Sequence, residues 1–174
     1  MPSLRTHALK YVIGILVVIG LRLLPHPPNI EPITATLMPF GKHFGVLGGA
    51  IFGLATVLLY DMFTGTLGAW SLLTMGGYVL LGVASGVYFK KDRGRFGYLW
   101  FAIVGTIAYD LLTGLTVGPL VFGQPFMEAL VGQLPFTLYH LAGNILLALA
   151  FSPLIEKWVV MNPSLTFKPV PQKA

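Results

Sequence analysis

Two copies of one short motif, Tyr-Asp-x-x-Thr-Gly, close apolar runs of the sequence at residues 60–65 and 109–114. Asp61 and Asp110 thereby place carboxylates at or just inside the ends of apolar segments, where a charge is costly and usually faces a cavity or a partner. Two roles are open for them: hydrogen bonding to a polar ligand, or solvation at a membrane interface. The repetition is either a relic of duplicated helical hairpins or ordinary helix-ending chemistry, with Gly in the left-handed conformation.

A second polar group lies in the last apolar run of the chain. His140 and Asn144 are four residues apart and share one helix face, and Tyr139 lies beside them. Side chains of this kind must face protein or a cavity, because lipid offers no hydrogen bonds. They are therefore expected to bind a ligand or to join two helices. No second imidazole occurs at ligand spacing, so no metal site is expected.

The stretch PHPPNIEP, residues 25–32, contains four prolines and cannot form a regular helix. Asn29 and Glu31 are its polar points, and an acid beside an apolar run is costly unless it faces a site. We therefore expect this stretch to be a loop that covers a ligand. Trp70 follows the Gly-rich turn GTLGA; it either stacks on that ligand or marks the membrane interface, as tryptophans often do.

Known enzyme signatures are missing from the sequence. It contains no GxSxG, HExxH or GxxxxGK[ST] motif and no plausible pairing of a nucleophile with a base. We expect no enzymatic activity, no cofactor and no hydrolysis of ATP by this chain alone. The absence of cysteine excludes disulfides and thiolate metal sites.

The elements that must position these residues are predicted to be membrane helices. The chain is 55% hydrophobic and 10% charged, with a mean hydropathy of +0.79. Its apolar runs approach the ~20 residues that span a bilayer, whereas a soluble helical bundle would need a charged outer face. We predict an all-α, six-helix transmembrane bundle forming a single integral membrane domain over residues 1–160, with residues 161–174 as a cytoplasmic tail. The predicted spans are about 9–24, 32–41, 44–61, 70–89, 96–113 and 134–158. Gly48, Gly49 and Gly53 with Gly82 and Gly86 form small-residue faces suited to close helix packing.

The positive charges indicate an orientation rather than nucleic-acid binding, although the net charge is +5. With six crossings, every lysine and arginine except Arg22 falls on one side, which is ten of the eleven. The positive-inside rule then places both termini and the KKDRGR connection, residues 90–95, in the cytoplasm of a cell that carries the protein in its inner or plasma membrane. The polar residues above then gather at the outer end.

The second predicted span is short for a crossing. Its roughly ten residues cover only about 15 Å of a hydrocarbon core that is about 30 Å thick. If it does not cross, however, Lys42 and the KKDRGR connection fall on the opposite side from the N-terminus, and the basic residues no longer share one side. A crossing becomes feasible when the irregular lead-in is shielded by protein or lines a polar cavity, and this is a first indication of a site.

Four stretches together resemble the membrane substrate-binding (S) components of energy-coupling factor (ECF) transporters, nearest to the cobalamin-type and related uncharacterised members. They are PHPPNIEPITA, FGKHFGVLGGAIFGL, the YDxxTG ends and GQPFMEALVGQLPFTLYHLAGNILLALAFSPLIEKW. The similarity covers most of residues 10–158. Its most specific parts are the PN-x-x-P stretch and the final H-x-x-x-N helix.

The resemblance implies a six-helix protein that captures a vitamin or similar micronutrient outside the cell. Its protein partners would be a transmembrane coupling protein and two cytoplasmic ATPases. The chain itself would lie in the lipid bilayer. Carried onto this chain, the loop at residues 28–32 would gate or line the pocket, and a group of side chains would surround it: Asp61, Trp70, Asp110, His140 and Asn144. Tyr139 joins this set as the neighbour of His140.

One feature departs from that family, and two other functions stay open. Many S components carry Ala-x-x-x-Ala on the first helix where the coupling protein docks, whereas this span offers Gly14 and Gly20 at a different spacing. The alternatives are a structural membrane subunit of a cell-envelope assembly, and a secondary transporter that uses the YDxxTG carboxylates for proton coupling.

Overall fold

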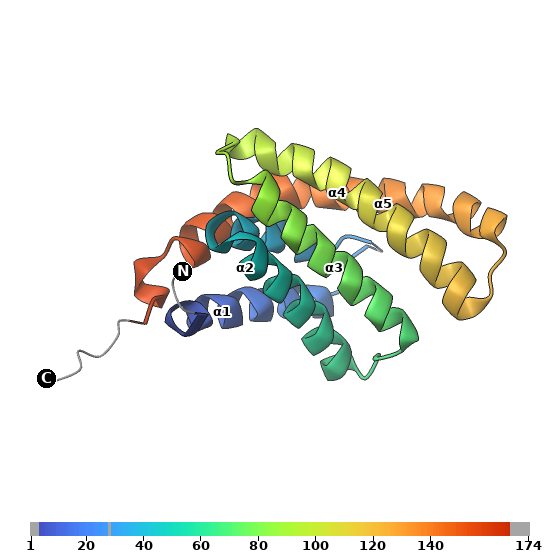
Figure 1. The fold of residues 1–174 in the computed structure, drawn as a ribbon, viewed down its shortest axis with the longest axis horizontal. Helices are drawn as coiled ribbons and strands as arrows, with labels where there is room; N and C mark the ends of the chain where they lie inside the picture. The colour runs from blue at the N-terminus through green and yellow to red at the C-terminus, as the bar shows by residue number, and fades with distance from the viewer. Residues whose placement is uncertain (1–3, 28, 168–174) are drawn as a thin grey trace, which may run out of the picture.

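Five long helices make up the described part of the chain, residues 4–167 apart from residue 28, in a computed structural model (Figure 1). They are α1 (Leu4–Leu23), α2 (Ile33–Thr64), α3 (Ala69–Tyr88), α4 (Gly94–Phe122) and α5 (Phe126–Ile155). A π-helical turn, η1 (Glu156–Val160), and a short 3-10 turn, η2 (Pro163–Leu165), follow. Each long helix is long and apolar enough to cross a membrane. The protein is therefore an all-α, multi-pass membrane protein.

Helix α2 is broken at Gly45 and doubles back on itself. The Gly45 backbone has φ +72° and ψ −166°, which is outside the helical region. The rings of Phe40 and Phe52 stack with centroids 4.1 Å apart, although twelve residues of straight helix would separate them by about 18 Å. Likewise, a Cβ on Gly49 would lie 3.1 Å from the Cα of Gly41. The helix thus forms a hairpin.

We call its two halves the short arm, residues 33–44, and the long arm, residues 46–64. They correspond to the second and third predicted spans, so the described residues show five helices of membrane-spanning length, and the sixth predicted helix is not shown as a separate one. The predicted boundary at Lys42 and His43 is wrong, since both residues remain helical. The break falls instead at Gly45, because glycine has no Cβ to oppose a positive φ.

The remaining bounds differ most around the second YDxxTG copy. Helix α4 was predicted to end at residue 113 but ends at Phe122, and α5 begins at Phe126 rather than at residue 134. Thr113 and Gly114 do not end the helix; it ends where Gly123 takes φ +66°. Most of the predicted connection between these two helices is therefore helical. In contrast, α1 and α3 lie close to their predicted ranges.

The long arm of α2 packs against α3 through glycines, as their spacing predicted. A Cβ on Gly53 would lie 2.5 Å from the carbonyl oxygen of Tyr78, and one on Gly82 would lie 2.6 Å from the backbone nitrogen of Ala50. The two backbones therefore approach too closely for any larger residue.

One end of the bundle, which we call the charged end, collects basic residues and their partners. Lys42 Nζ lies 2.8 Å from Glu156 Oε1 and 3.7 Å from Asp92 Oδ1. His43 Nε2 lies 2.6 Å from Glu156 Oε1. Lys10 Nζ donates to the carbonyl of Val160 at 2.6 Å. The start of α1, the turn of α2, the α3–α4 connection and the end of α5 thus meet here.

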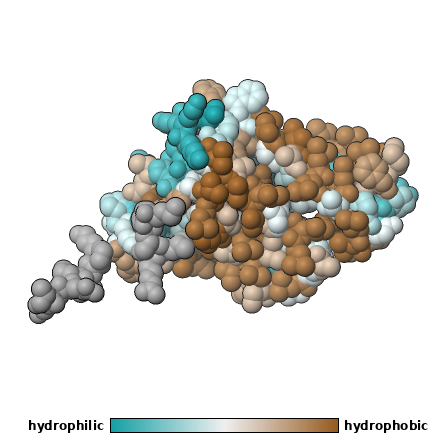
Figure 2. Space-filling model, in the orientation of Figure 1, coloured by the Kyte–Doolittle hydropathy of each residue, from teal (hydrophilic) through white to brown (hydrophobic). Residues whose placement is uncertain are grey.

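The surface of the molecule also shows where the charged end lies. In Figure 2 the strongest hydrophilic patch covers the α3–α4 connection, and much of the rest of the visible face is hydrophobic. The tail predicted over residues 161–174 starts at this charged end, where Phe167 N donates to Thr6 O at 3.0 Å. Residues 168–174 of that tail lie outside the described residues. The opposite end, which we call the loop end, carries the connection from α1 to α2.

Candidate ligand-binding site

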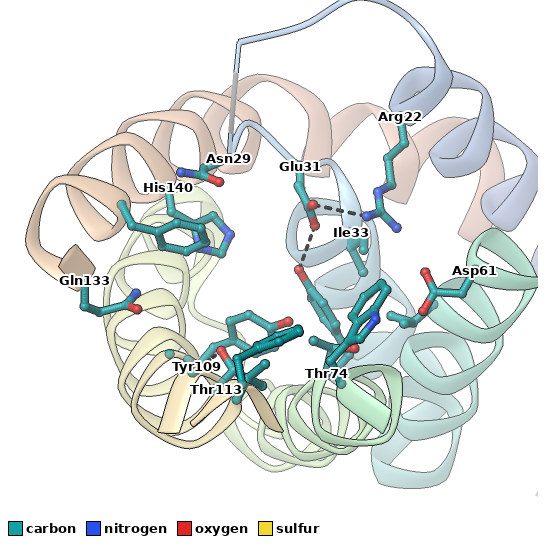
Figure 3. Close-up of a pocket in the computed structure, with 18 of the residues that line it drawn as sticks. Arg22, Asn29, Glu31, Ile33, Asp61, Thr74, Tyr109, Thr113, Gln133 and His140 are labelled. Carbon is teal, nitrogen blue, oxygen red and sulfur yellow. Dashed lines mark hydrogen bonds and ion pairs between the residues drawn. The ribbon is translucent and has the colours of Figure 1, made fainter. Parts of the chain in front are cut away.

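A cavity of about 480 Å³ lies at the loop end of the bundle (Figure 3). All five helices and the loop between α1 and α2 contribute to its wall, and polar and aromatic side chains dominate the lining. The lining residues are Arg22, Asn29, Glu31, Ile33, Val57, Asp61, Trp70, Thr74, Tyr78, Tyr109, Thr113, Gly114, Val117, Gly118, Phe122, Gln124, Gln133, Phe136 and His140. Its volume falls in the range of about 300–1,000 Å³ that is usual for small-molecule pockets.

An ionic group forms one side of the cavity. Arg22, near the end of α1, places Nη2 3.1 Å from Glu31 Oε1. The Tyr78 hydroxyl donates to Glu31 Oε2 at 3.1 Å. The Arg22 guanidinium also lies 3.6 Å from the ring centroid of Tyr60, in cation–π geometry. Glu31 is therefore fixed from two helices.

Asp61 lies on the same side of the cavity but lacks such partners. Its side chain is only 2% exposed, and no hydrogen bond or ion pair joins it to any residue that the structure describes. It lies in the last turn of α2, where Gly65 takes φ +69° and Thr66 N donates to the backbone oxygen of Asp61 at 2.9 Å. The carboxyl end of a helix already carries partial negative charge, so this location adds no stabilisation to the carboxylate.

The second aspartate has a partner. Asp110 Oδ1 lies 2.6 Å from His140 Nδ1, and both side chains are almost fully buried. Asp110 is not part of the cavity lining, whereas His140 is, and His140 Nε2 is buried without a hydrogen-bond partner. Asp110 therefore orients an imidazole whose other nitrogen remains available to a ligand.

Asn144 lies one helical turn beyond His140 and joins two helices. Its Nδ2 donates to Thr106 Oγ1 at 2.8 Å, and the side chain is 1% exposed. It does not line the cavity. Of the two roles that the sequence left open for Asn144, the structure shows the contact between helices.

The loop between α1 and α2 brings Asn29 and Glu31 to the cavity. Asn29 takes φ +64°, a left-handed conformation that asparagine tolerates better than most residues. Next to it, Ile30 packs on α5 so closely that a Cβ on Gly143 would lie 3.0 Å from the Cα of Ile30. Pro28 lies outside the described residues. The loop is thus held against α5 at Ile30, the residue between Asn29 and Glu31.

Five aromatic side chains complete the wall: Trp70, Tyr78, Tyr109, Phe122 and Phe136. The rings of Tyr78 and Tyr109 are 4.5 Å apart, and Tyr109 meets the His140 ring edge-on at 6.0 Å. Figure 3 shows Arg22, Glu31 and Asp61 on one side of the cavity and Asn29, Gln133 and His140 on the other. Polar side chains thus lie on both sides of the cavity.

Five of the eight predicted site residues line the cavity: Asn29, Glu31, Asp61, Trp70 and His140. Asp110 and Asn144 lie behind the lining. Tyr139 does not reach the cavity, and its side chain is 63% exposed. Because successive residues on a helix point about 100° apart, the neighbour of an inward-facing His140 turns away.

Several lining residues were missed by sequence reasoning. Arg22 did carry a signal, since it was the one basic residue outside the charge pattern. Tyr109 also carried one, as part of the second YDxxTG copy. Gln133 gives none, because it falls in the predicted connection between residues 113 and 134. Tyr78 gave none either, because a tyrosine within an apolar run looks like any other core residue.

The residues that the structure describes contain no group of three or more His, Cys, Asp or Glu side chains suited to a metal ion. Comparison of the chain with known protein families, curated proteins and solved structures finds no match.

Proposed function

We propose that this protein is the substrate-binding membrane subunit of an ECF-type importer, which captures a vitamin-like molecule for uptake driven by partner ATPases. The observation that carries this proposal is the cavity at the loop end. Three of its lining residues present buried polar atoms that lack a protein partner: Arg22 Nη1, Asp61 Oδ2 and His140 Nε2. Buried polar groups are normally hydrogen-bonded, so atoms of this kind around an open volume favour a bound polar ligand.

The proposed orientation places the cavity outside and both termini in the cytoplasm. Lys10, Lys42 and the α3–α4 connection lie at the charged end, and the positive-inside rule favours the cytoplasm for that end. In this arrangement the short arm of α2 crosses as one of six passes. The loop and its Arg22–Glu31 ion pair then face the outer compartment.

The resemblance to S components supports a mode of action in which the subunit binds and its partners supply energy. The sequence carries no nucleotide-binding motif, so uptake by this route needs a separate ATPase. Ligand binding itself does not need an ATPase. Ligand binding and the interaction with partners can therefore be tested in separate experiments.

The first test is binding by the purified protein in lipid nanodiscs without ATP. A panel of water-soluble vitamins, screened by thermal shift and native mass spectrometry, is expected to contain at least one that binds tightly. Gln133→Leu, which removes a polar lining side chain, should weaken this binding. Leu138→Ala, on the exposed side of α5, is the matched control and should not. If no vitamin binds, the proposal fails.

The second test is uptake in cells that express the protein with an ECF coupling protein and its ATPases. Uptake should require ATP hydrolysis, and co-purification should recover the coupling protein. A pull-down that recovers only envelope-synthesis proteins would instead indicate a structural subunit.

A proton-coupled secondary transporter is the second candidate, and the Asp110–His140 pair favours it. The pair is buried and bonded at 2.6 Å, and intramembrane acid–histidine pairs are a common feature of proton pathways. Uptake that survives ATP depletion but collapses with an uncoupler would support this candidate and contradict the first.

A further inference from the structure

The charges that face the cavity do not balance. Its acidic and basic lining residues, the two tyrosines apart, are Arg22, Glu31, Asp61 and His140. Arg22 is paired with Glu31, and His140 with Asp110 behind the wall. Of the two acids in the described cavity lining, Asp61 is the one without an ion-pair partner. One carboxyl group therefore remains without a basic partner.

No ion pair joins Asp61 to a basic side chain in the described structure, although Arg22 lines the same cavity. Arg22 makes its ion pair with Glu31, and no ion pair joins Arg22 to Asp61. The adjacent Thr66 N–H donates to the backbone oxygen of Asp61 and not to its carboxylate. A buried, unpaired carboxylate is strongly unfavourable. A ligand that supplies a positive group would remove this penalty, and an anionic ligand would increase it.

The aromatic walls favour the same kind of ligand. Trp70 is the second residue of α3, just after the short connection that follows α2, and its ring folds over that connection, since a Cβ on Gly68 would lie 2.7 Å from Trp70 Nε1. Tyr78 and Tyr109 add two further ring faces. Indole and phenol faces attract cations through their quadrupoles. A cation held at Asp61 would thus also meet aromatic rings.

We propose that the ligand carries a positively charged nitrogen, as an ammonium, an amidinium or a cationic heteroaromatic ring, and that Asp61 binds this group. The flat remainder of the ligand lies between the aromatic walls and reaches the polar side formed by Gln133 and His140. This inference names the substrate class and rests on the proposed function, in which the cavity holds a small molecule.

Three probes with one ring and different charge test the inference: pyridoxamine with an ammonium, pyridoxine with a hydroxyl, and 4-pyridoxate with a carboxylate. Binding to the wild-type protein in nanodiscs is measured by calorimetry at high probe concentration. We expect pyridoxamine to bind about 10- to 100-fold more tightly than the other two, as one charge-assisted hydrogen bond provides. In Asp61→Asn this preference should disappear.

Two further variants serve as controls. Glu128→Gln removes an exposed acid of α5 that lies near the same end but does not line the cavity, and it should keep the full preference for pyridoxamine. Asp110→Asn removes the acid that orients His140, so it should weaken binding of all three probes and lower thermal stability, but the preference for pyridoxamine should remain.

A measurement without any ligand completes the test. Because Asp61 is unpaired in the empty cavity, Asp61→Asn should raise the melting temperature by about 2–4 °C. Absence of a preference for the ammonium probe, a preference that survives Asp61→Asn, or a lower melting temperature in that variant overturns the inference. Failure of the proposed function looks different: ATPase-dependent uptake is then missing while the charge preference at Asp61 remains.

Discussion

The two YDxxTG copies have nearly the same sequence but different structures. In the first copy α2 ends at Thr64, with Gly65 in the left-handed conformation. In the second copy Gly114 stays helical and α4 continues to Phe122. Asp61 accordingly lies in a last turn and faces the cavity without a partner, whereas Asp110 lies within a helix and is bonded to His140.

This difference shows that the motif does not determine its own role. Thr-Gly permits a helix to end but does not require it, and the outcome depends on the residues that come after the glycine. After the first copy comes the Gly-rich connection to Trp70, and after the second come further apolar residues that continue the helix. The duplicated-hairpin and helix-ending interpretations are both incomplete for this reason.

The largest expected effect concerns the partner of each aspartate. In a double-mutant cycle, Asp110→Asn with His140→Gln should show a coupling energy of about 2–3 kcal/mol, because each single change leaves a buried group unpaired. The same cycle with Asp61→Asn should give a coupling near zero. The measurement is chemical or thermal unfolding in one detergent. Equal couplings would mean that the two acids are equivalent after all.

A smaller effect is expected at the two glycines. Gly65→Ala should destabilise the protein by about 1–2 kcal/mol, because an L residue is strained at φ +69°. Gly114→Ala avoids that strain, but its methyl group would meet the Gln133 side chain, which lines the cavity. We therefore expect it to change ligand affinity more than stability. Unfolding and binding measured on both variants distinguish the two cases, and strong destabilisation by Gly114→Ala would mean that the Gln133 side chain cannot move away from the new methyl group.

The smallest effect concerns the tyrosines that precede the aspartates. Tyr60 lies under the Arg22 guanidinium, so Tyr60→Leu should cost about 0.5–1 kcal/mol of stability through the lost cation–π contact. Tyr109 lines the cavity, and Tyr109→Leu should lower affinity for a bound vitamin. The comparison requires thermal shift with and without the ligand. Identical ligand-induced shifts in both variants would remove Tyr109 from the site.

The sequence predicted the helical, membrane-spanning class well, because uncharged apolar runs of bilayer length are rare in soluble domains. It also placed Asn29, Glu31, Asp61, Trp70 and His140, since a polar residue in an apolar setting is conspicuous. Those five line the cavity.

What the sequence could not provide were contacts made across the bundle. The pairing of Asp110 with His140, and of Arg22 with Glu31, depends on how helices pack and not on local spacing. The hairpin in α2 was misplaced by the charges of Lys42 and His43, which suggested a surface loop. In the structure the same two side chains lie within a helix and are bonded to Glu156.

The enclosure of the short arm has a consequence for how the protein inserts. Every residue from Ile33 to Gly41 is buried, so this segment is surrounded by protein and not by acyl chains. Bilayer thickness sets the length of helices that lipids surround, and it need not set the length of this one. A segment with that environment gains its stability from the helices around it, so its insertion depends on theirs.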